Sequence, residues 1–210
     1  MTSFTDLLIC IISLVFYYII NRFHKKESFE RKWSHFYLWM FISTFIGTFA
    51  HGARFYMTDN LFNILWMIMN IAGLISTYYS IYATISYANY SNNLEVKTIN
   101  ALTSVVLGFV GLTLFFNTFL LVKIFAGMGL IYIFYTHLRY YQIGIIGNGN
   151  IIFGIGVSFL TVFVHTFKIS LHKHFNYKDI SHLIMIISLC FIFTGINTIN
   201  KDRINRKILL

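Results

Sequence analysis

The chain is poor in charge and contains no proline. Only 11% of its 210 residues are Asp, Glu, Lys or Arg, and 57% are hydrophobic, whereas a soluble domain carries about 25% charged residues. Its two cysteines, Cys10 and Cys190, both lie inside apolar runs. The low charge excludes an ordinary soluble domain, and the two isolated cysteines exclude a disulfide framework. The composition is that of an integral membrane protein.

Long apolar runs fill nearly the whole sequence. A membrane-spanning helix needs roughly 20 apolar residues, so seven helices with short loops account for almost the full length. We therefore predict an all-α polytopic membrane protein, a single seven-helix transmembrane bundle over residues 1–210. Its expected spans are about 4–21, 33–52, 61–87, 98–116, 118–138, 151–171 and 179–199.

Local signals mark breaks and contacts between these spans. The apolar stretch on both sides of Asn117 is too long for one span, so a tight break is predicted there. The "GNGN" segment at 147–150 is the clearest turn signal in the chain. The small residues in "GTFAHG" and "FGIGVSF" favour close helix–helix contacts.

The net charge of +9 is interpreted differently in a membrane protein than in a soluble one. In a membrane protein, basic residues mark cytoplasmic loops and contact anionic lipid, so no nucleic-acid partner is expected. Eleven Lys and Arg residues fall on the side of the C-terminus and five on the other side. This predicts an outside N-terminus and a cytoplasmic C-terminus. The bias toward Phe, Tyr, Ile, Asn and Lys is typical of an AT-rich genome, and we expect the plasma (inner) membrane of a bacterium.

Histidines and aspartates collect at the predicted outer face. Asp179 and His182 open the last span three residues apart, so they share a helix face. Polar residues inside a bilayer usually face the bundle interior, and zinc takes three or four N or O ligands. Spans two, six and seven therefore bring together enough ligands for a metal site. The residues at this face are Asp6, His51, Asp59, His165, His172, His174, Asp179 and His182.

Simpler interpretations stand beside the metal site. A histidine at a helix end is commonly interfacial, and His172 with His174 fits a plain interfacial loop. His165 fits either interpretation. Thr48, one turn before His51, either bonds back to its own helix or directs its hydroxyl toward the same site.

Two motifs in this layout resemble the CREST superfamily of seven-transmembrane metal-dependent lipid hydrolases, in its alkaline ceramidase-like branch. In that branch the second helix carries Ser and His, the third begins with Asp, and the seventh carries HxxxH. "GTFAH" is similar to the second-helix motif, with Thr48 for the Ser, at a spacing one residue shorter, and His51 for the His. "FNYKDISH" is similar to the last motif, with His182 as its final His and Lys178 where the first His stands. In "FNILWMI", Asn63 takes the place of the Asp.

The resemblance implies a zinc-dependent intramembrane hydrolase of a lipid amide or ester, ceramidase-like, with a membrane lipid as its substrate. Zinc would be held by His51 and His182, with Asp179 or His165 replacing the missing ligand. Three further roles follow from the same resemblance. Asp59, Asp179 or Asn63 would orient or deprotonate the attacking water, and Thr48 would donate to the developing oxyanion.

A second hypothesis is a non-catalytic seven-helix membrane protein, lipid-binding or a sensor, that keeps the layout without the full metal site. Lys178 and Asn63, which both depart from the family pattern, motivate it. A transporter is a weaker third class, because no internal repeat is visible.

Overall fold

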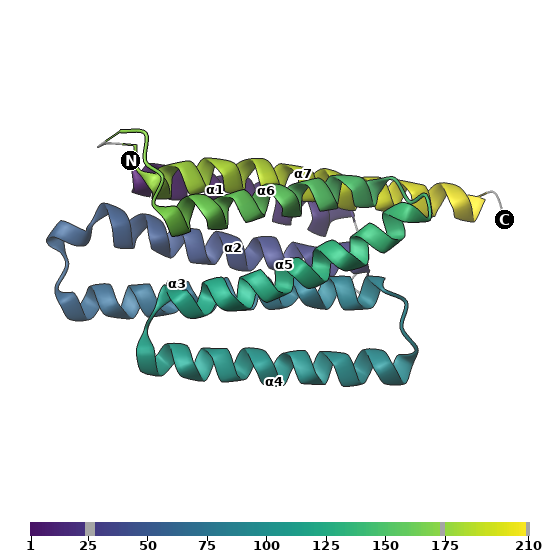
Figure 1. The fold of residues 1–210 in the computed structure, drawn as a ribbon, viewed down its shortest axis with the longest axis horizontal. Coiled ribbons are helices and arrows are strands. Elements are labelled where there is room, and N and C mark those ends of the chain that lie inside the picture. Colours follow the sequence, from purple (N-terminus) through teal and green to yellow (C-terminus); the bar gives the residue numbers. More distant parts are fainter. Residues whose placement is uncertain (24–27, 173–174, 209–210) are drawn as a thin grey trace.

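The computed structural model describes residues 1–23, 28–172 and 175–208. Within these ranges it is built from helices that run side by side along one long axis (Figure 1). They are α1 (Thr2–Phe23), α2 (Phe29–Gly52), the 3-10 turn η1 (Arg54–Tyr56), α3 (Asp59–Tyr87), α4 (Asn92–Phe116), α5 (Phe119–Gln142), α6 (Gly147–Phe167) and α7 (Tyr177–Ile208). The predicted all-α class is confirmed.

The bundle has two distinct ends (Figure 1). At the N-terminal end, α1 begins, α2 ends, α3 begins, α6 ends and α7 begins; the chain leaves the bundle at the opposite, C-terminal end. α1 packs against both α2 and α7, while α3 joins α2 to α4 and α5. α4 lies at the edge of the bundle and packs mainly against α3 and α5.

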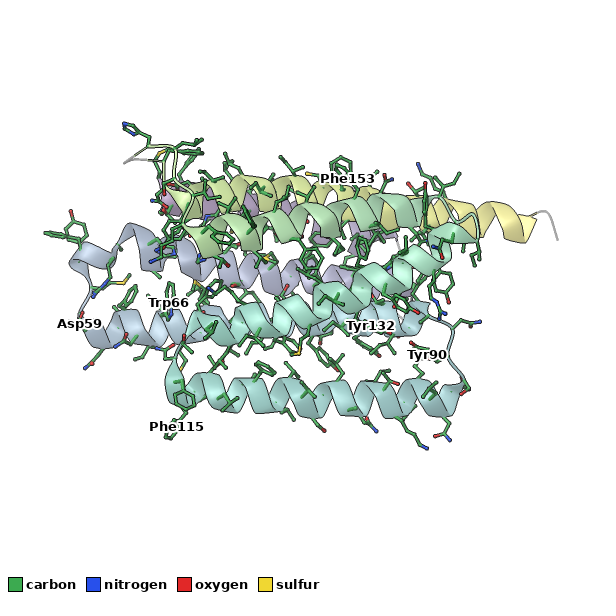
Figure 2. All side chains as sticks on the ribbon, viewed as in Figure 1. Asp59, Trp66, Tyr90, Phe115, Tyr132 and Phe153 are labelled. Atoms are coloured by element: carbon green, nitrogen blue, oxygen red, sulfur yellow. The ribbon has the colours of Figure 1, made fainter. Side chains whose placement is uncertain are left out.

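Six of these helices are long and apolar enough to cross a membrane, by length and composition. Large apolar side chains project outward from them, as Phe115 on α4 and Phe153 on α6 illustrate (Figure 2). α2 is not among the six: besides the charged Glu30, Arg31 and Lys32 it carries Ser, Thr, His, Tyr and Trp side chains along its length, which lower its mean hydropathy. It is nevertheless 24 residues long and lies against α1 and α3.

The predicted break near Asn117 is confirmed. Asn117 has a left-handed backbone with φ of 45° and ends α4. Thr118 then caps α5, because its hydroxyl accepts a hydrogen bond from the amide of Leu120.

The "GNGN" segment is not the predicted turn but the first turn of α6. The chain turns just before it, where Gly144 has φ of +87°. Gly147 instead permits a close helix contact: a Cβ there would lie 2.6 Å from the amide nitrogen of Ile199 and 2.8 Å from the carbonyl oxygen of Gly195. Gly147 therefore permits the close packing of α6 on α7 and does not form a turn.

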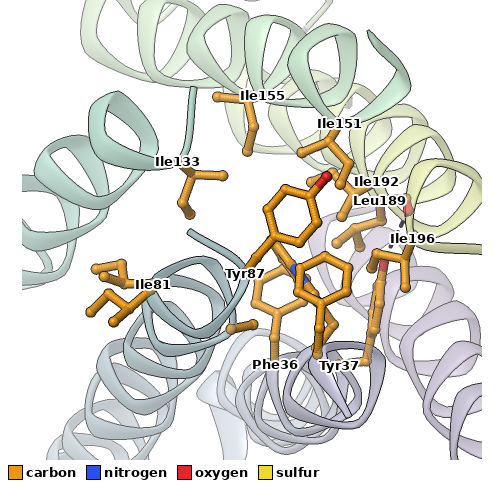
Figure 3. Close-up of a cluster of buried hydrophobic side chains, with 14 of the residues drawn as sticks. Phe36, Tyr37, Ile81, Tyr87, Ile133, Ile151, Ile155, Leu189, Ile192 and Ile196 are labelled. Atoms are coloured by element: carbon orange, nitrogen blue, oxygen red, sulfur yellow. Dashed lines mark hydrogen bonds between the residues drawn. The ribbon is translucent and has the colours of Figure 1, made fainter. Parts of the chain in front are cut away.

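A cluster of aromatic and branched side chains determines which faces of α2 and α7 point into the bundle (Figure 3). Tyr37 of α2 is fully buried, and its hydroxyl donates a 3.1 Å hydrogen bond to the carbonyl of Leu189 on α7. His51 lies about four helical turns after Tyr37, and His182 about two turns before Leu189. The core contact therefore orients both histidines toward the same interhelical space.

Candidate functional site

A buried carboxylate joins the two predicted zinc histidines at the N-terminal end. Asp6 of α1 is only 5% exposed. Its Oδ1 lies 3.5 Å from Nε2 of His182, and its Oδ2 lies 3.8 Å from Nε2 of His51. Gly47 makes room for it, because a Cβ there would approach Oδ2 to 3.3 Å. Three helices, α1, α2 and α7, thus bring one acid and two imidazoles together.

Thr5 fixes the orientation of the His182 ring. Its hydroxyl oxygen lies 2.8 Å from Nδ1 of His182, and its single proton goes to the Thr2 carbonyl at 2.9 Å or to Asp179 Oδ1 at 3.4 Å. When Thr5 donates to either of these acceptors, Nδ1 of His182 is the donor to Thr5. Nε2 then presents its lone pair to the Asp6 carboxylate. Ligating histidines typically use their second nitrogen in this way.

Two facing acceptors require a cation or a proton between them. Among the described residues, Asp6 Oδ2 is buried without a hydrogen-bond partner, an arrangement that costs free energy unless an ion or water satisfies it. Tetrahedral zinc ligands bound at 2.0–2.2 Å lie about 3.3–3.6 Å from one another, and the two observed N–O distances are 3.5 and 3.8 Å. The His182–Asp6 pair therefore has the spacing of two adjacent zinc ligands, and the His51–Asp6 pair is slightly wider.

Within the ranges that the structure describes, no three His, Cys, Asp or Glu side chains are already grouped as a complete metal site. A bound ion would have to draw the His51–Asp6 and His182–Asp6 pairs together. The donors are therefore present, but their final arrangement depends on the ion.

Asp179, one of the two predicted replacement ligands, has a different role in this structure. Its Oδ2 accepts a 2.9 Å hydrogen bond from the amide of Asn176, whose side chain accepts one from the amide of Lys178. This reciprocal pattern is a capping box at the start of α7. Among the described residues, the His–Asp ion pairs involve Asp6 and not Asp179.

His165, the other predicted replacement, lies near the cluster but does not join it. Its ring contacts Phe119 and Tyr177, with ring centroids 5.7 and 5.0 Å away. Its Nδ1 is buried and has no hydrogen-bond partner in the part of the chain that the structure describes.

Three residues given catalytic roles lie away from the Asp6 cluster. The Thr48 hydroxyl donates back to the Thr44 carbonyl at 2.9 Å, which is ordinary helix bonding. Asp59 lies at the start of α3 (Figure 2), where its side chain is 83% exposed and pairs with Arg54 at 2.6 Å. Asn63 is exposed, and its carbonyl accepts from Asn117. Among the described residues, no hydrogen bond or ion pair joins these three to His51, His182 or Asp6.

The rim of the site matches the simpler interpretation for one histidine. His172 is exposed in the segment between α6 and α7, where its backbone pairs with that of Phe175. His174, predicted to belong to the same interfacial loop, lies outside the described residues.

A cavity of about 550 Å³ extends from this cluster. Asp6, His51 and His182 line its polar end, while Trp33 and Ile192 line it deeper in the bundle. Along α2, His51 and Trp33 are about 27 Å apart at 1.5 Å per residue. The volume is typical of a small-molecule site, and the shape suits a long chain with a polar head.

Asp6 is the functional residue that sequence reasoning missed. It was placed at the outer face, but its role as partner to both histidines depends on α1 packing against α2 and α7 together. One signal was available: an acidic residue inside an apolar span usually marks a functional site.

Fold and site together define an all-α protein of membrane-spanning composition, with a histidine–carboxylate cluster at the end of an apolar cavity. The chain belongs to a family described as "Family of unknown function (DUF6962)", whose model matches residues 1–201. Neither the curated proteins nor the solved structures contain a match to it.

Proposed function

We propose that this protein is an intramembrane hydrolase that cleaves an amide or ester bond of a membrane lipid, with zinc as its cofactor. The observation that carries the proposal is the convergence of His51 and His182 on the buried Asp6 carboxylate. These two histidines were singled out from the sequence by the resemblance to the ceramidase-like lipid hydrolases. Such an enzyme requires its metal-binding histidines to lie together at the end of a substrate cavity, and these two line the polar end of one.

Asp6, His51 and His182 are the residues that would hold the metal. Zinc supplies Lewis-acid chemistry when bound, because it polarises the carbonyl group under attack. Thr5 holds the His182 ring so that Nε2 faces the site. Asp6 replaces Asp179 and His165 in the donor set, since it is the acid that lies beside both histidines.

The remaining residues of the cavity bind and orient the substrate. The apolar walls deeper in the bundle, which include Trp33, Phe36 and Ile192, accept an acyl chain and exclude water from it. The polar end then positions the amide or ester group beside Asp6. Holding the reacting groups together in this way supplies a large part of a typical rate enhancement.

The proposal includes seven membrane spans in the plasma (inner) membrane of a bacterium. α2 is counted as a span because it has 24 residues and lies against α1 and α3. The distribution of basic residues favours an outside N-terminus. The Asp6 cluster would then open toward the outer face.

A non-catalytic lipid-binding protein or sensor is the second candidate. Two observations favour it: Lys178 lines the cavity near the histidines, and the described donors are not yet grouped as a complete metal site. In this case the same cavity would bind a lipid without cleaving it.

A lipidomic comparison separates the two functions. Wild type and the His51→Ala/His182→Ala double variant are each reconstituted into vesicles of total bacterial lipid with added zinc. We expect a lipid amide or ester to be consumed, with its free fatty acid appearing, only with wild type. Equal lipid profiles would contradict hydrolysis, and a lipid that co-purifies with wild type unchanged would favour the binding protein.

A further inference from the structure

The cavity that contains the Asp6 cluster is also lined by two lysines. Lys123 lies in the second turn of α5 and Lys178 in the first turn of α7. Both side chains are half-buried, and none of the ion pairs found among the described residues involves either. Lysines inside an apolar bundle are costly unless an anion pairs with them.

The two lysines act on the same part of the cavity. The positive charges of both act electrostatically on the ring of His165, and that of Lys178 also acts on Asp6. Both lysines also line the same cavity as His165 and Asp6, so the four residues surround one space.

α6 adds two more polar groups to that space. Thr161 and His165 are one turn apart and both line the cavity. The Thr161 hydroxyl oxygen and the His165 Nδ1 atom are both buried, and neither has a hydrogen-bond partner within the described part of the chain. A hydroxyl and an imidazole N–H are both donors to an oxyanion.

Neither of the nearby acids forms an ion pair with these lysines in the described part of the chain. Asp6 lines the cavity but faces the two histidines. Asp179 is fully buried in the capping box of α7 and does not line the cavity. Two ammonium groups and two free polar atoms thus remain for a ligand.

We propose that the cavity binds an anionic lipid, whose phosphate or similar oxyanion contacts Lys123, Lys178, Thr161 and His165 while its acyl chain follows the apolar wall. Its assignment as the substrate rests on the proposed hydrolase function; its binding does not. This ligand class differs from that implied by the ceramidase-like resemblance, because a ceramide carries no charge.

Equilibrium binding in detergent tests the inference with probes that contain no cleavable bond. The radiolabelled probes are an ether-linked octadecenyl glycerol phosphate, the matching uncharged octadecenyl glycerol, and inorganic phosphate. Wild type should bind the phosphate lipid at least about tenfold more tightly than the uncharged lipid, the effect of one or two charged hydrogen bonds. Inorganic phosphate alone should bind far more weakly than either lipid.

Glutamine substitutions test whether Lys123 and Lys178 contact the phosphate group. Lys123→Gln and Lys178→Gln should each weaken binding of the phosphate lipid about five- to tenfold and leave the uncharged lipid unchanged, which also shows that the variants are folded. Lys168→Gln is the matched control, because Lys168 is exposed at the end of α6 and does not line the cavity.

Three results would overturn the inference: equal affinity for the charged and uncharged lipids, an equal loss with Lys168→Gln, or inorganic phosphate binding as tightly as the phosphate lipid. If the binding pattern holds and no lipid is cleaved, the hydrolase function fails while the anionic ligand stands.

Discussion

Each end of the bundle holds a polar cluster that contains histidine, and the two clusters differ in what surrounds them. At the C-terminal end, His137 bonds through Nδ1 to Asn148 at 2.6 Å, and Asn148 donates to Tyr87 at 2.9 Å. The His137 ring stacks on Tyr87 with centroids 5.1 Å apart, and none of these three residues lines the cavity. At the N-terminal end, His51 and His182 face a carboxylate with an unpartnered oxygen beside open space.

The difference shows that a buried histidine does not by itself make a functional site. His137 is fully buried, as the core of a bundle permits when the ring has a hydrogen-bond partner and aromatic neighbours. One atom there, Nε2, has no partner among the described residues, but the ring is fully buried and stacked on Tyr87. The N-terminal cluster combines an unpartnered carboxylate oxygen with an adjoining cavity, and that combination is typical of a ligand-binding site.

The largest expected effect is on turnover, which should depend on the N-terminal cluster and not on the C-terminal one. His182→Gln should reduce turnover of the lipid found by the vesicle comparison at least about 100-fold, because it removes a metal donor. His137→Gln should leave turnover per folded molecule unchanged. Stopped-time assays on both purified variants measure this, and loss of activity in both would erase the proposed distinction between the ends.

Stability should depend more on the C-terminal cluster than on the N-terminal one. His137→Ala removes a buried ring and leaves Asn148 short of a partner, which should lower the free energy of unfolding by about 2–4 kcal/mol. Denaturation by increasing detergent fraction measures the loss, with exposed His172→Ala as the control. A cost below about 0.5 kcal/mol would show that the C-terminal cluster is not structural.

A smaller effect should follow from the support of His182. Thr5→Val removes the acceptor that orients the ring, and such outer contacts typically account for 10- to 100-fold of metal affinity. Thr113→Val is the matched control, since Thr113 is also buried and its hydroxyl donates to the carbonyl of Phe109 in its own helix. Competition with a zinc chelator measures both variants; equal affinities would contradict the assigned role of Thr5.

The smallest effect concerns the space beside Asp6. In Gly47→Ala the new Cβ would lie 3.3 Å from both Asp6 Oδ2 and Met69 Sδ, so the carboxylate must shift by a few tenths of an ångström. We expect a two- to fivefold loss of turnover, since about 1 Å of misplacement costs about 100-fold. Gly111→Ala on α4 meets nothing within 4 Å and should leave turnover unchanged. A faster Gly47→Ala enzyme would contradict the role of this close contact.

Much of the fold was predictable because each span is a separate apolar run. The break at Asn117 followed from length alone, and the positions of the helices agree with the expected spans apart from their ends. The "GNGN" prediction failed because glycine permits both turns and close helix contacts, and only the packing of α6 on α7 distinguishes them.

The candidate site was predictable only in part. His51 and His182 were found through their motifs, but Asp6 belongs to no motif and becomes their partner only through the contacts of α1. Asp179 was predicted as a replacement ligand, and in this structure it caps α7, because "NYKD" contains the N-cap and acidic third position of a capping box. Lys178, which weakened the metal interpretation in the sequence, lies in the cavity where it suits an anionic ligand.

Zinc content of the purified protein is the most direct test of the metal site. After loading with zinc and gel filtration, the account predicts about one zinc per chain for wild type and for His137→Gln, and a near-complete loss for Asp6→Asn and for His182→Gln. Wild type that retains no zinc, or Asp6→Asn that retains as much as wild type, would contradict it.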